Sequence, residues 1–205
     1  TLVGADPVGY FGLRVAPAGD VNGDGYADLF VGAPAATDGA GKVVVFHGGA
    51  QGLRVGATLP GPPRAQLGDW IAAGADLDGD GFPELIASAP GTSGGAGSVM
   101  VFRGGAGGVA RDPWVTRDAI DGVDSGYGQA LLASDVDFDG RVDLVVSSSN
   151  AGSNHGRVYI YRGGPEGLAV TPVPLSGTDG AQAVFGWALA RVWRTQRHVD
   201  AFYAL

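Results

Sequence analysis

The side chains best suited to chemistry in this sequence are carboxylates, and they gather in three loops of nine positions. Each loop carries side-chain oxygens at positions 1, 3, 5 and 9 and a glycine at position 6, where the chain must turn sharply. These oxygen donors are Asp20, Asn22, Asp24 and Asp28 in the first loop, Asp76, Asp78, Asp80 and Glu84 in the second, and Asp135, Asp137, Asp139 and Asp143 in the third. Hard oxygen ligands at this density suit Ca²⁺, whereas Mg²⁺ needs stricter octahedral geometry and Zn²⁺ favours histidine or cysteine.

Position 7 completes the predicted ligand set through its backbone. The residue there differs freely between the loops, being Tyr26, Phe82 or Arg141, as expected if only its carbonyl oxygen binds the ion. An EF-hand would also need a bidentate acid at position 12, where these loops have valine or alanine. A single Asp-Gly run could be an ordinary hairpin turn, but three copies at one place in a repeat favour three Ca²⁺ sites.

The charge balance supports calcium as a ligand that stabilises the fold. The net charge is −8, and 11 of the 21 acidic side chains lie in the three loops. With a Kd of about 10⁻⁴ M, roughly 1 mM Ca²⁺ adds about 1.4 kcal/mol per site, whereas cytosolic calcium would leave the sites nearly empty. We therefore expect an extracellular or cell-surface location, with the periplasm as the alternative. A nucleic-acid partner is not expected, because the sequence has no basic patch. A membrane span is not expected either, because no apolar run is long enough.

The elements that position these loops recur along the whole chain. A large apolar residue followed by glycine opens each repeat, at Phe11-Gly12, Leu67-Gly68, Tyr127-Gly128 and Phe185-Gly186. In the first repeat, short apolar segments bounded by glycines predict strands over residues 11–16, 28–33 and 42–47, and a less regular one near 57–59. The 38 glycines and 12 prolines disfavour long helices. The acidic loop lies between the first and second of these strands.

Four antiparallel strands in a unit of about 58 residues predict a blade of a β-propeller, in which neighbouring blades bury one another's faces. We expect one all-β domain over residues 1–205, with repeats at 5–61, 62–121 and 122–177 and a partial repeat at 178–205. The partial repeat would supply strands over 185–190 and 199–205. Residues 1–4 are similar in sequence to residues 58–61, the outer strand of the first repeat. The expected fold is thus about four blade-equivalents, with the N-terminal strand closing the last blade.

The pattern resembles the FG-GAP repeat of the integrin alpha-subunit β-propeller. Phe11-Gly12 matches the FG element and Gly32-Ala33-Pro34 the GAP element, with the acidic loop between them. The second repeat keeps Ser88-Ala89-Pro90, and the third has Ser147-Ser148-Ser149 instead. The resemblance implies calcium loops on the lower face of the blades. That family's propeller has seven blades, so part of a larger propeller and a dimeric ring are the alternatives to a closed four-bladed unit.

The resemblance also implies a non-catalytic recognition or adhesion module that binds an extracellular protein or glycan through the face opposite the metal loops. The residues proposed for that face are Trp70, Asn154, His155 and Trp187. A carbohydrate-binding propeller is the alternative, and an accessory domain of a secreted enzyme is a weaker one. A G-x-S-x-G string at residues 91–95 lies in a glycine-rich hairpin with no helix after it, so we expect no enzyme activity from it.

Overall fold

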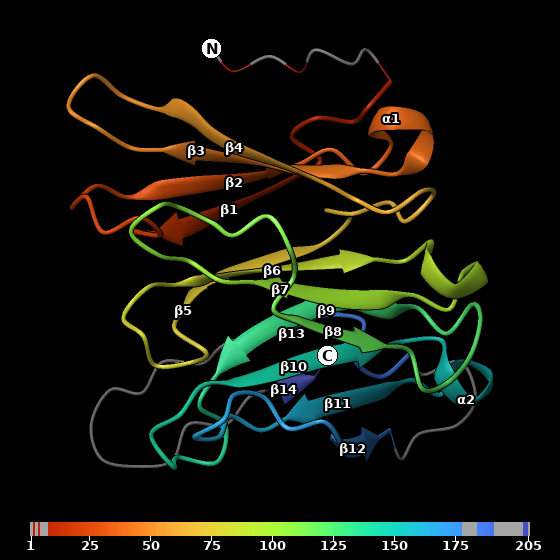
Figure 1. Cartoon of the computed structure of the whole chain (residues 1–205). Helices are drawn as coiled ribbons and strands as arrows, with labels where there is room; N and C mark the ends of the chain where they lie inside the picture. Colours follow the sequence, from red (N-terminus) through yellow and green to blue (C-terminus); the bar gives the residue numbers. More distant parts are fainter. Residues whose placement is uncertain (1, 3, 5–7, 178–183, 191–202, 205) are drawn as a thin grey trace.

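The computed structural model describes residues 2, 4, 8–177, 184–190 and 203–204. These residues form three four-stranded antiparallel sheets and one two-stranded sheet, and the strands of each large sheet pair in consecutive order (Figure 1). The all-β class and the four-stranded antiparallel blades are confirmed. Among the described residues, no helix has the length and hydropathy that a membrane crossing would need.

The sheets repeat one plan along the chain. The first contains β1 (Arg14–Gly19), β2 (Asp28–Gly32), β3 (Lys42–His47) and β4 (Arg54–Pro60). The second contains β5 (Ile71–Ala75), β6 (Glu84–Ala89), β7 (Ser98–Phe102) and β8 (Val115–Asp118), and the third β9 (Tyr127–Ser134), β10 (Asp143–Ser148), β11 (Arg157–Tyr161) and β12 (Val173–Ser176). Short helical turns join the second and third strands, namely α1 (Ala36–Gly39), η1 (Thr92–Gly94) and α2 (Ala151–Asn154).

All four strands predicted for the first repeat are present, but their boundaries agree with the prediction only in part. The third strand is found at the predicted residues, and the fourth is longer than predicted. The first strand begins three residues late, at Arg14, because the chain turns before it: the Leu13 N–H donates to the Tyr10 carbonyl at 3.0 Å. Within the two strands predicted for the partial repeat, over 185–190 and 199–205, the structure has β13 (Leu189–Ala190) and β14 (Tyr203–Ala204). These two strands pair antiparallel.

The core lies between the sheets. Val43 and Val45 face the second sheet and pack with Met100 and Phe102, whereas the alternate residues Val44 and Phe46 face the other way. The next interface, between the second and third sheets, is built by the large apolar side chains Val99, Val101, Tyr127, Leu131, Tyr159 and Tyr161. Stacking sheet on sheet in this way places β1, β5 and β9 beside one another. The alternation of the strands therefore produces the stack of blades in Figure 1.

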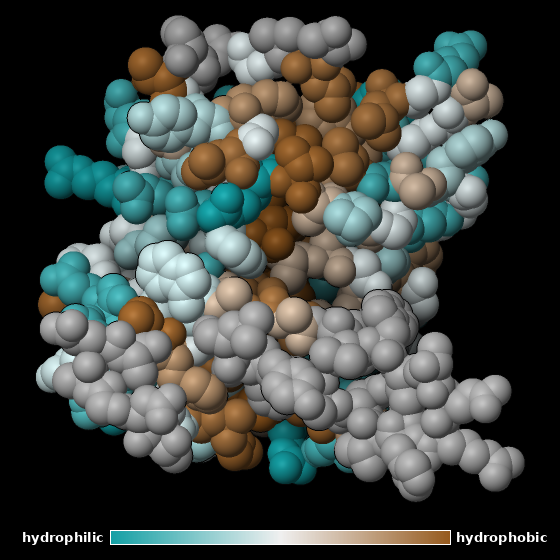
Figure 2. All heavy atoms as spheres, turned by 180° about the vertical axis from the view of Figure 1, so that it is seen from behind, coloured by the Kyte–Doolittle hydropathy of each residue, from teal (hydrophilic) through white to brown (hydrophobic). Residues whose placement is uncertain are grey.

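Among the described residues, no sheet covers the first one as each later sheet is covered by its predecessor. Val15 on β1 is 56 % exposed, whereas its repeat equivalents Ile71 and Leu131 are 8 % and 6 % exposed beneath the preceding sheet. Tyr10 and Leu13 are exposed on the same segment. Apolar side chains also gather near the middle of the face seen from behind (Figure 2). Burial of equivalent positions thus depends on whether a preceding blade is present.

The FG and GAP elements meet at the joints between blades. All four FG glycines adopt left-handed backbone angles, with φ of +87° at Gly12, +89° at Gly68, +82° at Gly128 and +83° at Gly186. A Cβ on Gly68 would lie 2.9 Å from the Lys42 carbonyl oxygen and 3.2 Å from the Gly32 Cα. A Cβ on Gly32, in turn, would overlap the Gly68 carbonyl oxygen. Glycine in both elements lets successive blades approach closely.

Backbone hydrogen bonds fasten each blade to the helical turn of the one before it. The Leu67 N–H donates to the Ala40 carbonyl at 3.0 Å, after α1. Two repeats later, the Val184 and Phe185 N–H groups donate to the Asn154 and His155 carbonyls at 3.2 and 3.1 Å. The entry segment of a blade is therefore held by the end of its predecessor that carries the helical turns.

The described N-terminal residues keep the contacts of an outer strand. A Cβ on Gly4 would lie 2.5 Å from the Phe11 Cβ, much as one on Gly61 would lie 2.6 Å from the Leu67 Cβ. This equivalence supports the predicted similarity of residues 1–4 and 58–61. The predicted closure of the last blade by that strand lies largely outside the described residues, because only Leu2 and Gly4 of the four are described.

Candidate metal centres

The three acidic loops lie at the same end of successive sheets. They connect β1 to β2, β5 to β6 and β9 to β10, and the turns α1, η1 and α2 stand at the opposite end (Figure 1). Each loop therefore sits between the first two strands of its blade. The repeat gives each blade one loop in one place, so the residues within each loop can be compared position by position.

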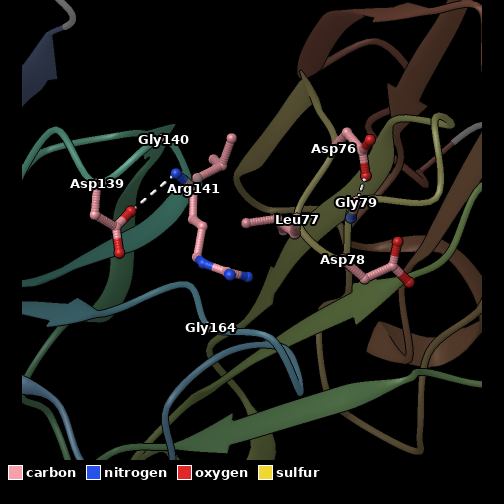
Figure 3. Close-up of a pocket in the computed structure, with 9 residues that line it drawn as sticks. Asp76, Leu77, Asp78, Gly79, Asp139, Gly140, Arg141 and Gly164 are labelled. Atoms are coloured by element: carbon pink, nitrogen blue, oxygen red, sulfur yellow. Dashed lines mark hydrogen bonds between the residues drawn. The ribbon is translucent and has the colours of Figure 1, made fainter.

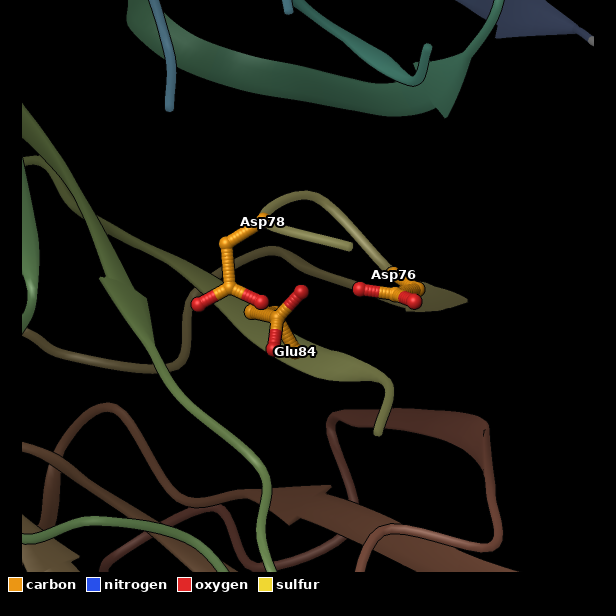
Figure 4. A group of neighbouring side chains, drawn as sticks. All are labelled: Asp76, Asp78 and Glu84. Atoms are coloured by element: carbon orange, nitrogen blue, oxygen red, sulfur yellow. The ribbon is translucent and has the colours of Figure 1, made fainter. Parts of the chain in front are cut away.

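Positions 1, 3 and 9 converge in two of the loops. One carboxylate oxygen from each of Asp76, Asp78 and Glu84 lies within 4.8 Å of the others, and these side chains point toward one another (Figure 4). The same holds for Asp135, Asp137 and Asp143. In the first loop position 3 is Asn22, whose amide donates to Asp24 at 2.9 Å. Three oxygens this close form a cradle that fits a hard divalent cation.

The carboxylate at position 1 shapes the turn. It accepts a hydrogen bond from the position 6 N–H in every loop, at 2.8 Å for Asp20 and 2.9 Å for both Asp76 and Asp135. The donor is always a glycine with φ between +86° and +94°. That left-handed conformation is why position 6 is glycine in all three loops.

Position 5 has a mainly local role in this geometry. Its carboxylate accepts from the position 7 N–H, as when Arg141 donates to Asp139 at 2.9 Å. Hydrogen bonding by Asn22, and then by the Tyr26 backbone, lowers the pKa of Asp24. A cavity of about 350 Å³ separates the second and third loops, and the Arg141 side chain extends into it (Figure 3). The side chain predicted to be irrelevant at position 7 therefore lies between two acidic loops.

Position 9 is a structural brace as well as a candidate ligand. Asp143 is fully buried, and its two oxygens accept from the Val136 N–H at 2.9 Å and the Gly163 N–H at 2.8 Å. Asp28 makes the same pair of bonds to Val21 and Gly48, at 3.0 and 2.8 Å. The carboxylate thus ties the loop to a glycine one or two residues after the third strand.

Sequence reasoning missed that brace, although a signal for it existed. Gly48, Gly104 and Gly163 are each the first glycine of a recurring Gly-Gly pair. A Cβ on any of them would overlap the carbonyl oxygen of position 8 in its own loop. The recurring glycine therefore marks a close contact between the end of the third strand and the acidic loop, about 20 residues earlier.

The electrostatics of these loops favour a bound cation. Burial, followed by repulsion from Asp78 and Asp76, raises the pKa of Glu84 to about 7 despite its backbone hydrogen bonds. Burial likewise raises the pKa of Asp143. Within the described part of the chain, the buried Asp135 Oδ1 and Asp137 Oδ1 have no hydrogen-bond partner. A divalent cation would supply both the missing partner and the missing positive charge, so the donor set fits Ca²⁺.

A substitution at position 9 separates the brace from metal binding. We expect Asp143→Ala to destabilise even the calcium-free protein, by about 2–4 kcal/mol, because two backbone N–H groups lose a charged acceptor. Asp139→Asn at exposed position 5 is the matched control, and it should leave the calcium-free protein nearly unchanged. Thermal melting in EDTA tests the difference. Equal losses from the two variants would contradict a bracing role.

The four residues predicted for recognition do not all come together. Trp70 is half-buried, and the Arg14 guanidinium stacks 4.2 Å from its ring centre, which places it at the joint between the first two sheets. Asn154 and His155 are exposed at α2, and their carbonyls accept the bonds from Val184 and Phe185. Trp187 lies on the segment that contains Val184 and Phe185, and it is 57 % exposed. Three of the four candidates therefore lie on adjoining segments opposite the metal loops.

Comparison with known proteins matches the same units. The FG-GAP repeat family matches residues 11–46, 67–102 and 127–161, each span running from an FG element to the third strand. Integrin alpha-IIb of Mus musculus is 38% identical over 107 residues, which is 50% of this chain and 10% of that protein. Integrin alpha-PS5 of Drosophila melanogaster is 42% identical over 102 residues, which is 45% of this chain and 10% of that protein.

A relative of another kind shares the repeats. Phosphatidylinositol-glycan-specific phospholipase D of Mus musculus is 34% identical over 151 residues, which is 65% of this chain and 18% of that protein. The chain thus spans less than a fifth of the length of any of these three relatives.

Proposed function

Because this chain belongs to the FG-GAP repeat family, we propose that it is a calcium-binding propeller module of the integrin type. One Ca²⁺ would bind in each acidic loop, held by the side chains at positions 1, 3, 5 and 9 and the carbonyl at position 7. The observation that carries this proposal is the convergence of Asp135, Asp137 and Asp143, two of which keep a buried oxygen without a partner among the described residues. Bound calcium would neutralise charges that the fold crowds together.

Calcium stoichiometry tests the proposal directly. Titration calorimetry should give three Ca²⁺ ions per chain, and Asp135→Ala should reduce the number to two because it removes the position 1 ligand of the third loop. Arg111→Ala changes an exposed residue outside the loops and should leave three. Magnesium at the same concentration should compete poorly, since it dehydrates reluctantly and needs octahedral geometry. A chain that binds no calcium, or a variant that still binds three, would overturn the assignment.

We further propose that the module recognises an extracellular protein or glycan and is not itself an enzyme. The one nucleophile motif, Ser93 in its G-x-S-x-G string, lies in η1, which leads into β7 instead of a helix. A nucleophile elbow requires a strand–turn–helix arrangement. Two of the three relatives named are integrin alpha subunits, and the phospholipase shares only this region. A role as accessory domain of a larger secreted protein is compatible with both kinds of relative.

The proposed recognition surface is the end of the blades that carries the helical turns. Asn154, His155 and Trp187 are exposed there on adjoining segments fixed by backbone hydrogen bonds. Exposed polar and aromatic side chains on a rigid scaffold are typical of binding sites. We propose an extracellular or cell-surface location for this single domain, because millimolar calcium would fill its sites, and a homodimer is one way to complete its ring.

Alanine substitutions can locate that surface. We expect the pair Asn154→Ala and Trp187→Ala to reduce binding by at least tenfold on arrays of extracellular proteins and glycans, because both side chains are exposed at the proposed surface. Tyr26→Ala is the control, since it removes an exposed aromatic ring at the metal end but keeps the backbone carbonyl. A hit confined to glycans would identify a lectin. Loss with the Tyr26 variant, and none with the pair, would place recognition at the other end.

A further inference from the structure

A basic residue closes the third strand of each blade and reaches the acidic loop of the same blade. Arg103 follows β7, and its Nε lies 2.5 Å from Asp78 Oδ2. Arg162 follows β11, and its Nη1 lies 2.6 Å from Asp137 Oδ2. Both arginines therefore pair with position 3 of the loop. The Trp114 ring, whose centre is 4.4 Å from the Arg103 guanidinium carbon, further fixes the first of them.

The first blade differs at both ends of this contact. Position 3 is Asn22, and the residue closing β3 is His47. The His47 Nδ1 lies 3.3 Å from Asp28 Oδ2 at position 9, and its side chain is 8 % exposed. Across the three blades, aspartate at position 3 accompanies arginine at the strand end, and asparagine accompanies histidine. A change in one charge is matched by a change in the other.

This matching reduces the difference in charge between the donor positions of the loops. The second and third loops have carboxylates at all four donor positions, and one guanidinium at the strand end offsets one of those four charges. The first loop has three carboxylates and an imidazole, which lacks the permanent charge of a guanidinium. A further contact between Arg54 and Asp24 spans 3.9 Å, and the Arg54 side chain is 66 % exposed, so this contact contributes little.

We propose that the residue closing the third strand is a positioning counter-charge matched to position 3 of the metal loop. The arginine holds one oxygen of that aspartate and leaves the other for the ion. In the third loop the division is visible: Arg162 pairs with Oδ2 of Asp137, while Oδ1 is buried without a partner among the described residues. The contact steadies the calcium-free loop and reduces the calcium affinity of a four-carboxylate site. This inference rests on the proposed calcium binding.

Transplanting the pair of the first blade into the second tests the match. Four proteins are compared: the unaltered chain, Asp78→Asn, Arg103→His, and the double variant. We expect Arg103→His to lower the melting temperature in EDTA, because four carboxylates lose their counter-charge, and to tighten the second site about tenfold. Asp78→Asn should weaken that site at least tenfold. In EDTA, Asp78→Asn should also lower the melting temperature, because it removes the ion-pair partner of Arg103, whereas the double variant should melt close to the unaltered chain. In calcium, the two charge changes offset each other, so the double variant should bind about as tightly as the unaltered chain.

Two measurements keep the outcomes separate. Melting in EDTA reports the coupling between positions 78 and 103 without any ion, and calcium titration in a background of Asp20→Ala and Asp135→Ala reports the second site alone. Arg111→His is the matched control, because it makes the same change in charge at an exposed arginine that has no ion pair among the described residues. Its effects should be absent from both measurements.

The result that overturns the inference is additivity: if the double variant shows the sum of the two single effects in EDTA, the residues are not matched. Coupling in EDTA together with no calcium binding by any variant would instead count against the proposed function and leave the ion-independent pairing standing. If Arg103→His leaves the calcium affinity of the second site unchanged, the arginine does not reduce that affinity, and this part of the inference is wrong. Each failure is therefore assigned to one of the two proposals.

Discussion

Removing calcium is expected to lower the melting temperature of this chain by about 8–16 °C. Three independent sites with an extracellular type of affinity would contribute roughly 4 kcal/mol at about 1 mM Ca²⁺. For a chain of this size, each 1 kcal/mol corresponds to about 2–4 °C. The physical source is the crowding of Asp76, Asp78 and Glu84, and of the matching trio in the third loop, which repel one another without an ion.

Calorimetry with 1 mM Ca²⁺ or with excess EDTA measures this effect. Adding calcium back after chelation should restore the original transition, and 1 mM Mg²⁺ should restore only a small part of it. The Asp135→Ala variant should lose about one third of the calcium-dependent shift. Identical transitions with and without EDTA would contradict calcium as a stabilising ligand.

The second large effect is expected from adding one methyl group at the joint between the first two blades, which should lower the free energy of unfolding. We expect Gly68→Ala to cost about 2–5 kcal/mol. Part of the cost, about 1–2 kcal/mol, is left-handed strain for an L-residue at φ +89°. The remainder, about 1–3 kcal/mol, is overpacking of the new Cβ against the Lys42 carbonyl oxygen at 2.9 Å and the Val43 side chain at 3.1 Å.

Gly12→Ala isolates the packing contribution. Gly12 occupies the same repeat position with φ +87°, but no atom of the described residues lies within 4 Å of a Cβ built on it. Its substitution should therefore cost only the strain, and denaturant unfolding in saturating calcium should show the Gly68 variant less stable by about 1–3 kcal/mol. If both variants lose the same stability, the close approach of the FG and GAP elements does not explain why glycine is present.

The types of residue in each loop, and their spacing, were sufficient to predict where the acidic loops lie within a blade. Ligand chemistry is local: side-chain oxygens at alternate positions and one glycine at the turn are adjacent in the chain, so their pattern is visible without a fold. The same is true of β3, whose predicted boundaries at residues 42–47 are those observed. The closure of the last blade and the binding of an extracellular protein or glycan remain predictions.

The late start of β1 shows where local pattern was insufficient. Residues 11–13 are apolar enough for a strand, but Gly12 takes a left-handed angle and the segment turns before Arg14. The role of Trp70 was also undecided by sequence, since a tryptophan beside an FG element can face solvent or a neighbouring blade. The structure pairs it with Arg14 of the previous blade, 56 residues earlier.

The sequence by itself determined the repeat, the order of the strands and the candidate oxygen donors, because each is encoded by residues close together in the chain. The tertiary structure alone decided which groups, distant in the chain, donate hydrogen bonds to those carboxylates or form ion pairs with them. Asp143 accepts a hydrogen bond from the Gly163 N–H, 20 positions later in the chain, and Asp137 pairs with Arg162, 25 positions later. Such pairs form only when β10 and β11 take their register, since register fixes which side chain at a strand's end meets the loop of its neighbour.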